Sequence, residues 1–167
     1  MLRRSRPVVV QLLLKMLRRT DDPALARLAE FAARLQEPAL RERLTALADH
    51  RDPEVRTQAV RGLGSYPHAE SIATLTRAAA AAEWSVRAQA VRSLGMLGDP
   101  QTLPLVQAAL RDPEWWVRLR AGLALTRFGP PGRNALLEAD VGPDQNARDM
   151  AHLMLGLSTQ ALAEFAA

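Results

Sequence analysis

A segment of roughly thirty residues recurs along this chain. Its copies begin as DPEVRTQAVRGLG at Asp52, EWSVRAQAVRSLG at Glu83 and PEWWVRLRAGLALTRFG at Pro113, and a weaker copy, PDQNARDMAHLMLG, begins at Pro143. The first three copies place a Val-Arg pair at intervals of 31 residues, starting at Val55, Val86 and Val117. A tandem repeat of this length restricts the fold to units that bury their apolar faces against their neighbours.

Apolar residues inside each copy follow a helical spacing. In the first three copies an alanine follows the valine by four residues and a leucine follows it by eight, at Ala59, Ala90 and Ala121 and at Leu63, Leu94 and Leu125. Residues with this spacing share one face of a helix, and the small alanine allows a neighbouring helix to approach closely. Each copy is therefore predicted to form one helix.

A second amphipathic segment separates these helices. Its copies cover about residues 38–49, 68–81, 101–110 and 132–138, and residues 22–35 predict one further helix. Gly and Pro pairs between the segments, such as Gly64 with Pro67 and Gly98 with Pro100, are typical of a helix end followed by a helix start. The pattern predicts an all-α, right-handed α-solenoid of about five helical hairpins.

The segments LGDPQTLPLVQAALRDPEWWVR and DPEVRTQAVRGLG resemble HEAT repeats of the short bacterial kind, also called PBS-lyase HEAT-like repeats. The resemblance covers about residues 22–157, so residues 22–167 are expected to form the repeat array, and residues 1–21 a separate basic helix. It implies the fold but leaves the activity open, because this family includes scaffolds, adaptors, lyases acting on bilin chromophores and metal-dependent hydroxylases.

Charge and composition exclude several function classes. The chain has no cysteine, which excludes disulfides and thiolate chemistry. Its net charge of +4 comes from the first twenty residues, which hold six basic residues and no acid; the remaining 16 basic residues face 18 acids, a net charge of −2. We therefore expect no specific nucleic-acid partner.

The arginine that follows each repeat valine is the most regular polar feature. These residues are Arg56, Arg87, Arg118 and, in the weaker copy, Arg148, and each has an acid four residues earlier. Such an i, i+4 pair on an exposed helix face is favourable but contributes only a few tenths of a kcal/mol. We expect a structural ladder of these pairs, in preference to an anion-binding one.

Catalytic machinery is not visible in the sequence. The three histidines stand apart, no His-Glu dipeptide occurs, and no nucleophile or phosphate-loop motif is present. We expect a non-enzymatic protein without cofactor or metal. The alternative is a HEAT enzyme like a bilin lyase or a DNA glycosylase, the latter using Trp84, Trp115 and Arg118.

Tryptophans mark one position of the repeat. Trp84 and Trp115 are 31 residues apart, so they occupy equivalent positions on adjacent repeats, and Trp116 adjoins them. Aromatic neighbours of this kind are enriched in binding hot spots. Two interpretations stay open: a partner-binding ridge, or packing over the junction between hairpins.

The first twenty residues form the least repeat-like segment. Between Val8 and Leu17 only Gln11 and Lys15 interrupt an apolar run, and the basic residues that could contact a membrane or partner are Arg3, Arg4, Lys15, Arg18 and Arg19. A basic helix with a broad apolar face can cap the solenoid or lie on an anionic membrane surface. No secretory signal is expected, because the apolar run is broken and no cleavage site follows.

Taken as a whole, the sequence predicts a scaffold or adaptor that binds another protein. We expect it in a bacterial cytoplasm, or peripherally at the inner membrane.

Overall fold

The computed structural model describes residues 2–19, 21, 23–157 and 161, with side chains from Pro7 onward. This part of the chain contains ten α-helices and two short 3-10 segments, and no strand. The helices are α1 (Leu2–Leu17), α2 (Leu25–Leu35), α3 (Pro38–Leu47), α4 (Pro53–Leu63), α5 (Ala69–Ala78), α6 (Trp84–Leu97), α7 (Leu103–Ala108), α8 (Trp115–Arg127), α9 (Pro130–Asp140) and α10 (Gln145–Gly156), with the 3-10 segments η1 (Pro100–Thr102) and η2 (Ala109–Arg111) on either side of α7.

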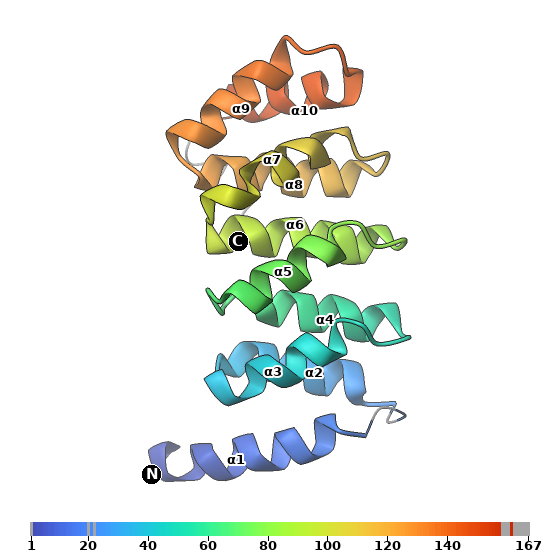
Figure 1. Ribbon diagram of the computed structural model, residues 1–167, viewed down its shortest axis with the longest axis vertical. Coiled ribbons are helices and arrows are strands. Elements are labelled where there is room, and N and C mark those ends of the chain that lie inside the picture. Colours follow the sequence, from blue (N-terminus) through green and yellow to red (C-terminus); the bar gives the residue numbers. More distant parts are fainter. Residues whose placement is uncertain (1, 20, 22, 158–160, 162–167) are drawn as a thin grey trace.

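The helices form a two-layered stack of hairpins, which confirms the predicted α-solenoid. The even-numbered helices α2, α4, α6, α8 and α10 pack on one another in one layer, and each of α3, α5, α7 and α9 packs on the even-numbered helix that follows it. Figure 1 shows this stack along its long axis, with α1 at the lower end and α9 and α10 at the upper end.

Helix boundaries follow from capping residues. Asp52 and Asp144 accept hydrogen bonds from backbone N–H groups in the first turns of α4 and α10, and proline occupies the first turn of α3, α4 and α9. Helix α9 starts at Pro130, two residues before the predicted segment, because Gly129 adopts a φ of 63° and proline can begin the helix directly.

Close approach between even-numbered helices depends on small residues. A Cβ atom added at Gly95 of α6 would lie 2.4 Å from the Cβ of Ala124 on α8, and one at Gly62 of α4 would lie 3.0 Å from that of Ala33 on α2. Such contacts leave no room for a larger side chain. The repeat alanines Ala59, Ala90 and Ala121 are fully buried, as their helical spacing predicts.

Helix α1 packs against α2 and α3 and forms the first hairpin with α2. It buries the stripe Val10, Leu13 and Leu17, and the guanidinium of Arg43 on α3 donates to the carbonyl oxygen of Leu17, with Nε at 2.9 Å. Burial of Arg43 and the nearby charge of Arg18 both lower the pKa of this guanidinium. Helix α1 therefore lies at the end of the stack, packed on the first helices that follow it.

We expect Gly95→Ala to destabilise the protein by about 1–3 kcal/mol, because the new methyl group must push α6 away from α8. Gly156→Ala is the matched control, since nothing lies within 4 Å of a Cβ at that position. Urea denaturation of both variants measures the difference. Equal midpoints would contradict the close packing described for α6 and α8.

Candidate interaction surfaces

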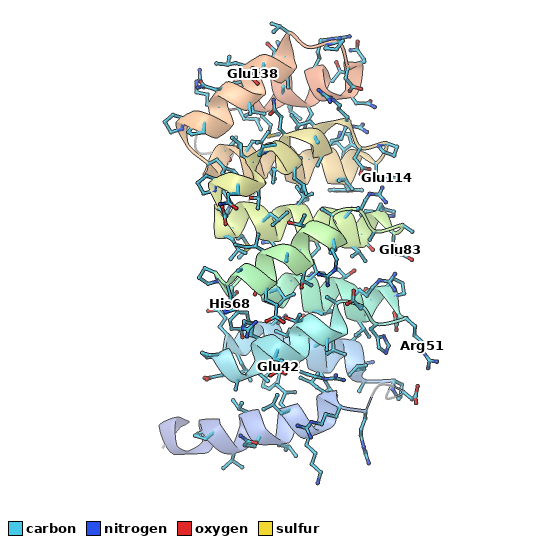
Figure 2. All side chains as sticks on the ribbon, viewed as in Figure 1. Glu42, Arg51, His68, Glu83, Glu114 and Glu138 are labelled. Carbon is cyan, nitrogen blue, oxygen red and sulfur yellow. The ribbon has the colours of Figure 1, made fainter. Side chains whose placement is uncertain are left out.

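The three tryptophans lie at the loop edge of the stack, where α6 and α8 begin. Trp84 is the first residue of α6, and Trp115 and Trp116 are the first two residues of α8. Their exposed fractions are 45%, 44% and 51%, and the rings of Trp115 and Trp116 meet edge to face with centroids 4.8 Å apart. Figure 2 shows the preceding residues, Glu83 and Glu114, on the same edge of the molecule. We call these three residues the tryptophan edge.

The repeat arginines hold the loops that precede their own helices. The Nη1 atom of Arg87 donates to the carbonyl oxygens of Ala81 and Ala82, at 2.9 and 2.8 Å. Arg56 and Arg118 bind the carbonyls five and six residues before them in the same way, and Arg148 binds the carbonyl of Gly142. Each arginine thus fixes the turn that leads into its helix.

The acid partners of two of these arginines come from the next repeat. Arg56 pairs with Glu83 at 2.6 Å, and Arg87 binds both carboxylate oxygens of Asp112, at 2.8 and 2.9 Å. The prediction of i, i+4 pairs with Asp52 and Glu83 was therefore wrong. The carboxylate of Asp52 is occupied by the N–H of Glu54, and the guanidinium, once turned toward the loop carbonyls, faces the neighbouring repeat.

These contacts change the ionisation of the acids. The hydrogen bond from Arg56 lowers the pKa of Glu83. Burial by itself raises the pKa of Asp112, but hydrogen bonds from Arg87 and from the N–H of Glu114 outweigh it, and the pKa lies below its ordinary value. Each carboxylate fastens the loop before its own helix to the arginine of the preceding repeat.

Helix α1 presents a second apolar surface to solvent. Val8, Leu12 and Met16 are exposed on the side away from the buried stripe, and Lys15, Arg18 and Arg19 are exposed beside them. The side chains of Arg3 and Arg4 lie outside the described residues. We call Val8, Leu12 and Met16 the α1 stripe. None of the described helices is long and apolar enough to span a membrane.

A cluster of four arginines that the sequence analysis did not single out lies on the even layer. Arg61 of α4, Arg92 of α6, and Arg120 and Arg127 of α8 are close enough that the other three charges each lower the pKa of Arg92, after the larger effect of its burial. We call these four residues the arginine patch. The sequence does contain a signal for it, because residues 84–97 and 115–127 include five arginines and no acid.

The repeat geometry agrees with a comparison of the sequence with protein-family models. The model for HEAT repeats matches residues 7–86 and 77–156. This protein belongs to the HEAT-repeat family. The first match starts within α1, in agreement with the packing of α1 and α2 as a hairpin. A search of curated proteins gives no match to this chain.

Arg118 and the histidines, the candidates for enzymatic chemistry in this HEAT-repeat protein, contact backbone groups or solvent. Arg118 is held by the carbonyls of Asp112 and Pro113, so its guanidinium is committed to a loop. His50 and His68 accept backbone N–H groups just before α4 and at the start of α5, and His152 is exposed and 3.4 Å from Asp140. Within the described part of the chain, no three His, Asp or Glu side chains lie close enough to share a metal ion.

We expect Arg87→Gln to lower the free energy of unfolding by about 1–3 kcal/mol, because Asp112 and two loop carbonyls lose their charged donor. Arg34→Gln is the matched control, since Arg34 makes only an exposed i, i+4 pair with Glu30 and should change stability by less than about 0.5 kcal/mol. Chemical denaturation of both variants decides the point; a loss at Arg87 no larger than at Arg34 would contradict the assigned contacts.

The lowered pKa values of Glu83 and Asp112 predict that the free energy of unfolding falls at low pH. Their contribution is fully present above the unfolded-state values of about 4 and is lost as the pH falls through the lower folded-state values. Denaturation at pH 6 and pH 3 should therefore show a smaller acid loss for Arg87→Gln than for the wild type. Parallel losses in the two proteins would refute the coupling.

Proposed function

We propose that this HEAT-repeat protein is a non-enzymatic scaffold that binds another protein through the tryptophan edge. The observation that carries the proposal is the exposure of about half of each of three large aromatic side chains on adjacent repeats. Isolated exposed apolar residues are ordinary, but three tryptophans at one edge form a surface of the kind found in binding hot spots.

The rigidity of the edge supports the same proposal. The loops that lead to Trp84 and Trp115 are held by Arg87 and Arg118, and Arg87 also fastens the loop before α8 to α6. Rings presented from fixed loops lose little conformational entropy when a partner binds. A packing role alone would favour rings that are covered by the neighbouring hairpin, whereas about half of each ring is exposed.

We expect Trp84→Ala combined with Trp115→Ala to weaken binding of a protein partner by at least about 2 kcal/mol. Crosslinking and affinity purification from the source cells would identify the partner with wild-type protein, and titration of that purified partner would give the affinities. The matched control is Leu137→Ala, because Leu137 is 45% exposed on α9. A partner that binds all three proteins equally would refute this role of the tryptophan edge.

A second candidate function is peripheral attachment to an anionic membrane, supported by the α1 stripe. Its apolar residues are flanked by Lys15, Arg18 and Arg19, and this combination binds interfacial lipid. The packing of α1 on α2 does not compete with such attachment, because the buried stripe and the α1 stripe lie on different sides of the helix. Localisation in a bacterial cytoplasm or at the inner membrane belongs to this proposal.

We expect the wild-type protein to sediment with vesicles of phosphatidylglycerol and to be released by high salt, which screens its basic residues. Val8→Asp combined with Leu12→Asp should abolish sedimentation without changing the thermal melt, since both side chains are exposed. Ala39→Asp with Ala73→Asp adds the same charge at exposed positions on α3 and α5. Wild-type protein that ignores the vesicles at low salt would exclude membrane attachment.

A further inference from the structure

The arginine patch has no acidic partner in the part of the chain that the structure describes. Among the described residues, no hydrogen bond or ion pair neutralises the guanidinium groups of Arg61, Arg92, Arg120 or Arg127. The acids of the even-numbered helices are engaged elsewhere: Glu30 with Arg34, Glu54 with Gln58 and Asp149 with Gln145. Helices α6 and α8 hold no acid at all. Within the described part of the chain, four like charges therefore lie together with no acid among them, Arg61 and Arg127 exposed and Arg92 and Arg120 half-buried.

Burial makes this arrangement unfavourable in the free protein. Arg92 and Arg120 are half-buried, and burial lowers the pKa of both guanidinium groups. The charges of Arg61, Arg120 and Arg127 lower the pKa of Arg92 further, and the charge of Arg61 lowers that of Arg120. Partly desolvated like charges destabilise a fold unless something neutralises them. An anion bound at the patch would remove this unfavourable interaction.

Apolar residues flank the patch along the stack. The repeat spacing places Phe31 of α2, Arg61, Arg92, Leu123 of α8 and Leu153 of α10 at equivalent positions of successive even-numbered helices. Phe31 and Leu153, at the two ends of this row, are 46% and 42% exposed. Leu123 is buried, so the row presents an apolar residue at each end and arginines between them.

The size of the surface limits what can bind. The hollow between Arg92, Arg120 and Arg127 has a cavity volume of about 10 Å³, the space of one water molecule. An organic ligand cannot enter it. Across five helices about 8–10 Å apart the row extends for roughly 32–40 Å, which matches an extended chain of about ten to twelve residues.

We propose that the even layer binds an extended acidic segment of a partner protein, with its carboxylates on the arginine patch and apolar side chains at its ends on Phe31 and Leu153. The inference rests on the proposed scaffold function and gives the chemistry of one partner. Guanidinium groups bind carboxylates through two parallel hydrogen bonds, so four of them favour a run of Asp or Glu residues.

Two observations favour a protein segment over nucleic acid. The exposed ends of the row are apolar, and a phosphate backbone offers nothing to cover them. Beyond the first twenty residues the chain carries a net charge of −2, so the patch lacks the wider positive field that phosphate binding requires.

Fluorescence polarisation with a labelled twelve-residue peptide tests the proposal. The peptide carries six glutamates in its centre and two leucines near each end. A second peptide has glutamine in place of glutamate, and a twelve-nucleotide single-stranded DNA is the third probe. We expect the wild-type full-length chain to bind the glutamate peptide at least tenfold more tightly than the glutamine peptide or the DNA.

Charge variants locate the binding. Arg92→Gln with Arg120→Gln should weaken binding of the glutamate peptide at least tenfold. The matched control, Arg111→Gln with Arg133→Gln, removes the same charge at exposed positions of η2 and α9 and should bind like the wild type. Arg61→Gln with Arg127→Gln, at exposed positions of the patch, gives the same test without altering half-buried residues. Thermal melts should show no loss of stability in either patch variant, because repulsion is relieved.

The outcomes separate this inference from the scaffold proposal. Equal peptide binding by the patch and control variants, or no measurable binding by the wild type, would overturn it. Tighter binding of the DNA through the same arginines would assign the patch to nucleic acid and also overturn it. Trp84→Ala with Trp115→Ala should bind the glutamate peptide normally, so a failed peptide test leaves the tryptophan edge as a separate question.

Discussion

The close contact between neighbouring even-numbered helices is the constraint on which the rest of this structure depends. Gly95 against Ala124 and Gly62 against Ala33 allow these backbones to approach each other almost without intervening side chains. A solenoid unit has no core of its own, so it is stable only when its neighbour is near. The small residues at these contacts are therefore as important for the fold as the large apolar residues that surround them.

The repeat arginine fixes the positions of the loops at one edge of this stack. Because Arg87 binds the loop before α6 and also Asp112 before α8, the starts of two helices are held at a fixed offset. Similar contacts about thirty residues apart recur elsewhere, as when the Tyr66 hydroxyl donates to the carbonyl oxygen of Glu37, 2.9 Å away. Burial and the nearby Glu37 raise the pKa of Tyr66 to about 12. The polar contacts thus follow the same period as the apolar ones.

The sequence was sufficient to predict the fold because its repeat appears directly as a spacing between like residues. It predicted the helices, the buried alanines and the alignment of Trp84 with Trp115. It failed for the acid partners of Arg56 and Arg87, because a local spacing rule cannot rank a neighbour four residues away against one in the next repeat. The arginine patch was missed for a related reason: Arg61 and Arg92 share one position of the repeat, but Arg120 and Arg127 lie at other positions, and only the stacking of helices brings the four together.

Arginine therefore has two physical roles in this chain, separated by its position on the helix. Near the start of α6 and α8, Arg87 and Arg118 find loop carbonyls, and their charge is used within the fold. Further along the same helices, Arg92, Arg120 and Arg127 have no such acceptor among the described residues, and the charges of Arg120 and Arg127 act unfavourably on Arg92. Their substitution by uncharged residues would relieve that repulsion, so their presence is better explained by a ligand than by the stability of the stack. The fold holds these helices in fixed positions, and the arginines that have no partner among the described residues can bind an acidic ligand.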